Sequence, residues 1–142
     1  MAYCRWLSVR LQLSIRLPTE WEWQWAAVAS TQKNYPWGEW NEQRANSYES
    51  GIGRTVAVGL YPLGRGSFGV DDMTGNVLEW CLNSYDQPSD IFLNPSHTCV
   101  LRGGSWNSSG PGGLRASMRG GYRPNKRNNV IGFRILCLSP ID

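Results

Sequence analysis

The stretch Val100-Leu-Arg-Gly-Gly-Ser-Trp106 places a short apolar run ahead of two glycines, and Ile131-Gly-Phe-Arg-Ile-Leu-Cys137 follows further along the chain. Both stretches have the composition of short strands. They bracket a polar loop, Asn107 to Val130, that is far longer than an ordinary connection. Loops of such length are usually functional or disordered. Because strands flank this one on both sides, we expect residues 101–134 to form a ligand-contacting surface.

The charge at this end of the chain is one-sided. From Ile91 to Ile141 there is no Asp or Glu, although the net charge of the whole chain is only +3. The basic residues are scattered singly among Gly and Asn: Arg102, Arg115, Arg119, Arg123, Lys126, Arg127 and Arg134. Arginine can bind several loop carbonyls at once. A structural role is therefore favoured for several of them, and no nucleic-acid partner is expected.

Two helices are expected upstream of these strands. Thr19-Glu-Trp-Glu22 is a capping box, which predicts a helix from Glu20 to about Ala29. One face of this helix is expected to carry Trp21, Trp25 and Val28, with Trp23 further round. Residues 2–13 are predicted to form the other helix, because apolar side chains recur there at helical spacing: Tyr3, Trp6, Leu7 and Leu11.

Short strands are expected elsewhere in a chain that is otherwise rich in loops. Leu13–Leu17 and Thr55–Val58 have strand composition, and Phe68–Trp80 is predicted to run from a loop into a strand. The 142 residues include 16 Gly and 8 Pro, which favour turns, and 8 Trp, whose large side chains can hold such loops together. The length fits one domain.

The cysteines and the termini give few functional signals. Cys4, Cys81, Cys99 and Cys137 form no CxxC pair, so we expect reduced and mostly buried thiols, with a disulfide as the alternative. No stretch is long and apolar enough to span a membrane, so no membrane partner is expected. No signal peptide is visible, which favours the cytoplasm.

Six motifs occur in a characteristic order along the chain: Arg16-Leu-Pro-Thr-Glu-Trp-Glu-Trp23, Tyr35-Pro-Trp-Gly38, Arg44-Ala-Asn46, Asp72-Met-Thr-Gly-Asn-Val-Leu-Glu-Trp80, Leu101-Arg-Gly-Gly-Ser-Trp106 and Gly132-Phe-Arg134. Together they resemble the formylglycine-generating enzyme superfamily, a branch of the C-type lectin fold. The resemblance implies one loop-rich α+β domain over residues 1–142, with two helices and short antiparallel strands. In that family an N-terminal portion with strands precedes the stretch similar to Ala2-Tyr-Cys-Arg-Trp-Leu-Ser8. We therefore expect a reduced sheet that lacks this part.

The resemblance also bears on catalysis. The oxidases of the superfamily carry two copper-binding cysteines just after the stretch similar to Gly103-Gly-Ser-Trp106. Here Asn107-Ser-Ser-Gly-Pro-Gly-Gly-Leu114 holds no cysteine. Copper(I) needs soft thiolate ligands, so no copper is expected. The iron-dependent sulfoxide synthases need a histidine cluster, and His97 is the only histidine. We predict a protein that is not an enzyme, with an oxidase acting on peptidyl cysteine as the alternative.

The C-terminal part is similar to the variable proteins of diversity-generating retroelements, whose variable stretch lies between Gly-Gly-Ser-Trp and Ile-Gly-Phe-Arg. This implies a bacterial or phage protein that binds a macromolecular ligand, expected to be a protein. Asn, Ser, Gly, Tyr and Val can all arise from mutated Asn codons, and Tyr, Ser and Gly suit adaptable binding surfaces. The predicted ligand contacts are Trp106, Asn107, Ser108, Ser109, Gly112, Gly113, Ser117, Gly120, Gly121, Tyr122, Asn125, Asn128, Asn129 and Val130.

Within this stretch, Arg115, Arg119, Arg123 and Arg127 are predicted to be fixed framework. Two alternatives stay open. The stretch is also typical of a plain loop with turn-forming residues. The chain is also consistent with an appended structural or regulatory domain of a larger protein.

The family resemblance further implies a structural calcium ion. Its ligands would be the carboxylates of Asp72 and Glu79 and the carbonyls of Gly75 and Val77, a set of hard oxygen donors that suits Ca²⁺. Leu78 replaces the Trp that is usual in the family, without being a ligand. The alternative is that Asp72 and Glu79 cap turns or pair with arginine.

Overall fold

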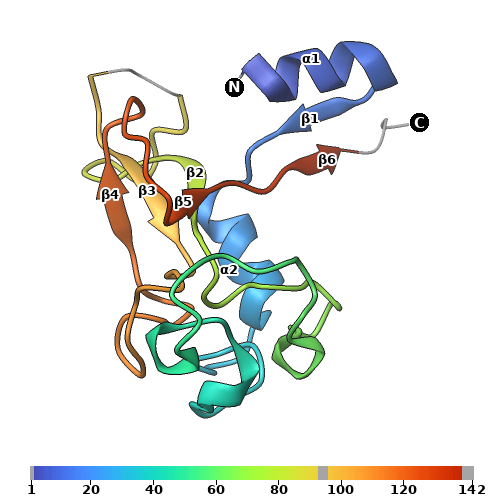
Figure 1. The fold of residues 1–142 in the computed structure, drawn as a ribbon. Helices are drawn as coiled ribbons and strands as arrows, with labels where there is room; N and C mark the ends of the chain where they lie inside the picture. Colours follow the sequence, from blue (N-terminus) through green and yellow to red (C-terminus); the bar gives the residue numbers. More distant parts are fainter. Residues whose placement is uncertain (1, 93–95, 139–142) are drawn as a thin grey trace.

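The computed structural model describes residues 2–92 and 96–138 and has the expected loop-rich α+β fold (Figure 1). Both predicted helices are confirmed, and neither is long and apolar enough to cross a membrane. In chain order the described elements are α1 (Ala2–Leu11), β1 (Ser14–Arg16), α2 (Glu20–Val28), η1 (Glu42–Arg44), η2 (Tyr48–Ser50), η3 (Pro62–Gly64), β2 (Leu78–Ser84), β3 (Cys99–Arg102), β4 (Gly120–Tyr122), β5 (Ile131–Gly132) and β6 (Leu136–Leu138).

The strands form two sheets. The larger has the order β4-β3-β2-β5, in which β3 is antiparallel to β2 and β4, and β5 is parallel to β2. The smaller pairs β1 with β6 antiparallel, next to α1 (Figure 1). The parallel pair differs from the expectation of antiparallel strands only. Parallel neighbours need a long crossover, and the chain from β3 through β4 and the loop after it provides one.

Helix α2 begins where the capping box predicts. The Glu22 amide donates to the Thr19 hydroxyl at 3.2 Å, and the Thr19 amide donates to the Glu22 carboxylate at 2.8 Å. Arg16 binds the same carboxylate through two hydrogen bonds of 2.7 and 2.6 Å. The hydrogen bond from Arg16 is the main cause that lowers the pKa of Glu22 to about 2.

The buried face of α2 differs from the predicted one at its tryptophans, although Val28 is buried as expected. Trp21 and Trp25 are 56% and 55% exposed, whereas Trp23 is buried at 1%. The Trp23 indole donates to the Glu79 carboxylate on β2 at 2.7 Å, and its ring lies 5.5 Å from the guanidinium carbon of Arg102 on β3. Because tryptophans occupy alternate positions in this helix, their spacing does not identify which of them is buried. Trp23 is the buried one because its indole contacts Glu79 and Arg102 on the sheet.

Strand β2 joins two hydrophobic cores. Successive side chains of a strand point to opposite faces, so Cys81 enters one core and Leu82 the other. The main core, between α2 and the larger sheet, consists of Trp23, Ala27, Val28, Met73, Cys81, Val100 and Ala116. The smaller core, next to α1, consists of Cys4, Ile15, Leu17 and Leu82.

The cysteines are free and mostly buried, as expected, whereas most of the predicted apolar face of α1 is exposed. All four thiols are free, and Cys4, Cys81 and Cys99 are buried while Cys137 is exposed. Burial raises the pKa of the Cys81 thiol. Cys4 is the buried residue of α1. Three residues of the predicted apolar face are about half exposed: Tyr3, Trp6 and Leu11.

Two glycines after β3 are required by their surroundings. Gly103 and Gly104 have φ angles of +93° and +69°, in the region that disfavours other residues. A Cβ at Gly103 would lie 3.0 Å from the Trp23 ring, and one at Gly104 would lie 2.6 Å from Leu114. These glycines therefore allow the chain to turn tightly against the main core before the long polar segment begins.

Three strand predictions need correction. Thr55–Val58 forms no strand, because the Val56 amide and carbonyl bind the Asn76 side chain, at 3.0 and 3.3 Å, instead of a neighbouring strand. Gly120–Tyr122, predicted as loop, is β4, since pairing with β3 outweighs the low strand preference of glycine. The predicted strand 131–137 is divided between β5 and β6, which belong to different sheets.

Candidate ligand-binding surface

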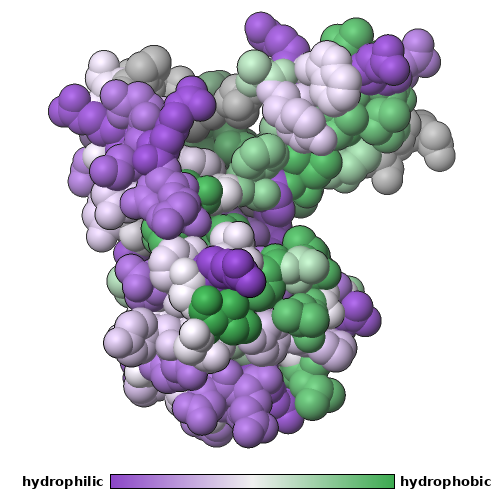
Figure 2. Space-filling view, viewed as in Figure 1, coloured by the Kyte–Doolittle hydropathy of each residue, from purple (hydrophilic) through white to green (hydrophobic). Residues whose placement is uncertain are grey.

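The predicted contact residues lie at the surface of the molecule. All belong to the described part of the chain, and none of them is buried. The exposed ones are Asn107, Ser109, Gly112, Ser117, Tyr122, Asn125, Asn128 and Asn129, and the half-buried ones are Trp106, Ser108, Gly113, Gly120, Gly121 and Val130. Figure 2 shows hydrophilic residues gathered over β4 and the loop that follows it.

The same segment also has an inward side. Leu114 is 0% exposed, and Ala116 is 1% exposed and part of the main core. The Ala116 amide donates to the Asn34 carbonyl at 2.7 Å. The segment is therefore packed and hydrogen-bonded, and its polar residues face outward because intervening apolar residues face inward.

Glu20 fastens this segment to α2. Its buried carboxylate accepts hydrogen bonds from Arg119 at 2.7 and 3.0 Å and from Arg102 at 3.5 Å. Arg102, only 1% exposed, also donates to the Ala116 carbonyl at 2.7 Å and to the Gln24 side chain. Burial lowers the pKa of Arg102. Arg119 therefore holds the framework position that the sequence predicts for it.

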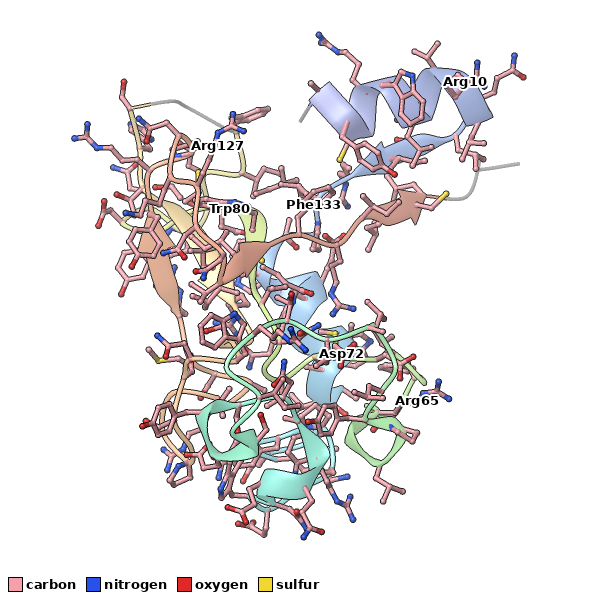
Figure 3. The ribbon with its side chains drawn as sticks, in the orientation of Figure 1. Arg10, Arg65, Asp72, Trp80, Arg127 and Phe133 are labelled. Atoms are coloured by element: carbon pink, nitrogen blue, oxygen red, sulfur yellow. The ribbon has the colours of Figure 1, made fainter. Side chains whose placement is uncertain are left out.

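The remaining framework arginines are exposed. Arg115 lies beside the hydroxyl of Tyr35, whose pKa is raised by burial. Arg123 and Arg127 form no ion pair within residues 2–92 and 96–138. Arg127 lies at the outer end of the loop after β4 (Figure 3). The exposed side of the segment therefore carries positive charge without an acidic partner on the described part of the chain.

Helix η2 supports the start of the segment. The Tyr48 amide donates to the Ser108 carbonyl at 3.0 Å. The Glu49 carboxylate accepts the Gly110 amide at 2.8 Å and the Ser47 hydroxyl at 2.7 Å. Burial acts against the charged form of Glu49, but these hydrogen bonds outweigh it and lower its pKa. The loop after β3 is therefore fixed from a distant part of the sequence.

Trp106 connects the two ends of the segment. Its indole donates to the Asn129 carbonyl at 3.3 Å, and its amide donates to the Asn76 carbonyl at 3.0 Å. Beside it is a cleft of about 400 Å³, lined by Tyr48, Gly51, Gly53, Trp106 and Asn107. The contribution of η2 and Gly53 to this cleft was not predicted, because nothing in the sequence of residues 48–53 indicates which distant loop they contact.

Two of the four predicted calcium ligands, Asp72 and Glu79, are in contact with Arg134. Both Glu79 carboxylate oxygens accept hydrogen bonds from Arg134, one at 2.9 Å, and one oxygen also accepts the Trp23 indole. Arg134 further donates to the carbonyls of Asp71 and Asp72, at 3.1 and 3.3 Å. The Glu79 carboxylate is thus paired with an arginine, in line with the arginine-pair alternative.

The side chain of Asp72 is engaged as well, because its carboxylate accepts the Gly59 amide at 3.0 Å. Asp72 and Glu79 line one cavity of about 290 Å³ in the middle of the molecule (Figure 3). Both predicted carboxylate ligands thus accept hydrogen bonds from groups of the protein, as in the alternative in which they cap turns or pair with arginine. The calcium site therefore stays a prediction without support from this geometry.

The single histidine lies apart from these groups. The Nδ1 atom of His97 is 3.6 Å from the Asp90 carboxylate. In the part of the chain that the structure describes, no three His, Cys, Asp or Glu side chains are grouped so that they could hold a metal ion.

Comparison with known proteins matches residues 1–137 to a family described as the sulfatase-modifying factor enzyme 1-like domain. The hercynine oxygenase of Mycolicibacterium smegmatis is 33% identical over 94% of this chain and 34% of its own length. The inactive C-alpha-formylglycine-generating enzyme 2 of Bos taurus is 32% identical over 94% of this chain and 45% of its own length. The chain thus spans about a third to a half of these relatives.

Two solved structures have the same fold. The Treponema denticola variable protein 1 superposes with a TM-score of 0.72 and 28% identity over 88% of this chain and 48% of that protein. PvdO from Pseudomonas aeruginosa superposes with a TM-score of 0.79 and 29% identity over 94% of this chain and 56% of that protein. The predicted resemblance to the formylglycine-generating enzyme superfamily and to variable proteins is confirmed.

The prediction that the protein is not an enzyme is contradicted by these relatives. Hercynine oxygenases are enzymes, and three of them match 94% of this chain at 31–33% identity. The prediction rested on the lack of a cysteine pair and of a histidine cluster in this sequence. Because the chain spans about a third of those enzymes, that lack does not decide whether the protein is catalytic.

Proposed function

Because this chain belongs to the family of the sulfatase-modifying factor enzyme 1-like domain, we propose that it binds a protein ligand through the exposed residues between Asn107 and Val130. The observation that carries the proposal is the division of this segment into two sides. Its Asn and Tyr residues and most of its Ser residues are exposed, while Leu114, Ala116 and Arg119 fix it to the core and to α2.

The division supports binding because the residues that would contact a ligand differ from the residues that stabilise the fold. Residues on the outer side can change without removing core contacts, while the inner side keeps the backbone in place. Tyr122 is 43% exposed and offers a large, rigid contact area, and Ser and Asn offer adaptable hydrogen bonds. We further propose that the outer residues are diversified, as the similarity to a variable protein suggests.

The proposal is tested by randomising the outer side and selecting for binding to a chosen protein, such as lysozyme, in a display format. The library positions are Asn107, Ser109, Ser117, Tyr122, Asn125, Asn128 and Asn129. A matched control library randomises the exposed residues of α1: Ala2, Tyr3, Arg5, Trp6, Val9, Arg10 and Leu11.

We expect folded variants and specific binders from the first library and many fewer from the control. Equal yields, or a first library that does not fold, would contradict the proposal. Diversification is tested separately in the encoding genome. It predicts a near-copy of codons 101–134 with Asn codons beside a reverse transcriptase gene, and the lack of both would remove that part of the proposal.

A second candidate function is suggested by the relatives named hercynine oxygenase. In this alternative the same surface binds a substrate of an oxygenase. The test is the consumption of dissolved oxygen and of hercynine by the protein, with heat-denatured protein as the control. Consumption above the control supports the oxygenase, and its absence under conditions in which a hercynine oxygenase of the family turns over removes it.

A further inference from the structure

The cleft beside Trp106 has the features of a small binding site. Two aromatic residues, Tyr48 and Trp106, line it together with Gly51, Gly53 and Asn107. Tyr48 is 66% exposed, so its ring is available to a ligand. The volume, about 400 Å³, falls within the range of small-ligand pockets, about 300–1,000 Å³, and suits a single ring better than a long chain.

The cleft is held open by the backbone. Gly51 and Gly53 both have a φ angle of +68°, and a Cβ at either would meet no atom within 4 Å. Because both residues are glycines, neither places a side chain in the cleft. Their positive φ angles make other residues unfavourable at both positions.

Hydrogen bonds hold the backbone of Tyr48 and both the backbone and the indole of Trp106 before any ligand arrives. The Tyr48 amide binds the Ser108 carbonyl at 3.0 Å, and the Trp106 amide and indole bind the carbonyls of Asn76 and Asn129. A site that is already ordered loses little conformational entropy on binding. These hydrogen bonds of the cleft are therefore already formed when no ligand is bound.

The lining chemistry selects the ligand group. Aromatic rings attract other aromatic rings in stacked or edge-to-face arrangements and also attract cations. A cation is disfavoured here, because no lining residue is acidic and the neighbouring Glu49 carboxylate already accepts hydrogen bonds from the Gly110 amide and the Ser47 hydroxyl. A sugar ring is also disfavoured, since the Trp106 indole N–H is already bound to the Asn129 carbonyl, which leaves the side-chain polar atoms of Tyr48 and Asn107.

We propose that this cleft binds an aromatic side chain, of tyrosine or tryptophan, that projects from the protein ligand. The ring lies between Tyr48 and Trp106, and its hydroxyl or indole N–H faces the Asn107 amide. This inference rests on the proposed function, because it assigns one contact of that ligand to one place on the surface. It also assigns a binding role to η2, which lies outside the segment predicted from the sequence.

The first test is a titration with N-acetyl-L-tyrosinamide, followed by the indole N–H signals of the ¹⁵N-labelled protein. We expect a saturable shift of the Trp106 signal and binding that is about 2- to 10-fold weaker in Tyr48→Ala, in keeping with the loss of one aromatic contact. Tyr3→Ala is the matched control, since Tyr3 is an exposed aromatic residue on α1. It should bind like the unmodified protein.

Tetramethylammonium and methyl glucoside are the competing probes. An equal or larger Trp106 shift with either of them, or an equal affinity of Tyr48→Ala and the unmodified protein, overturns the assignment. A second experiment places Tyr48→Ala in binders selected from the loop library. Unchanged affinity there refutes the cleft while the proposed function stands. A library without binders refutes the proposed function, and the titration still decides the cleft.

Discussion

At the scale of single residues, Arg102 combines a buried charge with several hydrogen-bond partners. It is 1% exposed, faces the Trp23 ring and binds the Glu20 carboxylate, the Ala116 carbonyl and the Gln24 side chain. Removing one partner from a buried charge network is costly, because the groups left behind have neither water nor a replacement partner. Arg102 thus joins α2, β3 and the segment from Asn107 to Val130.

We expect Arg102→Ala to lower the free energy of unfolding by about 3 kcal/mol or more. Arg119→Ala is the control, since Arg119 shares Glu20 but is 30% exposed, and its loss should cost about 1–2 kcal/mol. Urea denaturation followed by tryptophan fluorescence measures both. Equal losses in the two variants would show that burial of Arg102 does not decide its contribution.

The loop after β3 has a spacing that can be tested with a covalent bond. A Cβ built at Gly113 lies 3.7 Å from the Cβ of Ser108, within the distance of about 3.5–4.5 Å that a disulfide requires. We expect the double variant Ser108→Cys/Gly113→Cys to oxidise readily. Thiol titration of the denatured protein should then detect only the four native cysteines.

The single variant Ser108→Cys is the control and should show one thiol more than the native protein. A double variant that keeps both new thiols after mild oxidation would show that the loop does not hold the described spacing in solution. A Cβ at Gly113 would also lie 3.1 Å from the Ser109 carbonyl, so a shift of a few tenths of an ångström is expected on oxidation.

At the scale of elements, the start of α2 depends on one carboxylate. Arg16 and the capping box hold the pKa of Glu22 near 2, below its ordinary value of 4.5. A carboxylate whose pKa is lowered by folding contributes stability above its unfolded pKa and loses it as the pH falls. The contribution should therefore be present above about pH 4.5 and disappear towards pH 2.

We expect Glu22→Gln to lower the free energy of unfolding by about 1–2 kcal/mol at pH 7. This is less than the full pKa shift implies, because Glu22 is about a third exposed and solvent screens the pair. Near pH 2 the variant and the unmodified protein should be equally stable. Thermal unfolding at several pH values measures the difference, and a difference that does not change with pH would exclude the Arg16 pair as its source.

Motifs of neighbouring residues predicted where α2 begins better than they predicted which side of a helix is buried or which strands pair. The capping box of α2 depends on residues three positions apart, and it is found as predicted. The inner face of α2 depends on Glu79 and Arg102, which lie far away in the sequence. Likewise, Val56 forms no strand because a distant side chain, that of Asn76, takes its backbone hydrogen bonds.

The candidate site divides in the same way. The composition of Asn107–Val130 indicated its exposed residues, because polar residues without apolar periodicity favour the surface. The opposite side of the cleft, Tyr48 to Gly53, could not be predicted, since its contact with Ser108 is a backbone hydrogen bond that no side-chain pattern records.

At the scale of the whole molecule, the two cores differ in size. The main core joins α2 to the larger sheet, whereas α1, β1 and β6 are held by a smaller core of Cys4, Ile15, Leu17 and Leu82. A two-stranded sheet has limited stability by itself. We expect the unit of α1, β1 and β6 to open locally more often than the rest of the molecule.

Hydrogen–deuterium exchange measures this difference. Amides of Ser14–Arg16 and Leu136–Leu138 should exchange at least ten times faster than those of β2 and β3, in line with lower local stability. Leu82→Ala should widen the gap, because Leu82 is the contribution of β2 to the smaller core. Equal protection of both regions would show that the molecule opens as a single unit.

The pairing of β1 with β6 has a consequence for protein engineering. Ser14 lies opposite Leu138, so the chain enters and leaves the sheets at neighbouring points. In Figure 1 this pair and the loop between β3 and β4 occupy opposite corners of the molecule. The unit from Ser14 to Leu138 can therefore be spliced into a surface turn of a host protein that covers Ile15, Leu17 and Leu82 with apolar side chains in place of α1. Both junctions would then lie on the host side and the loop between β3 and β4 would project away from it.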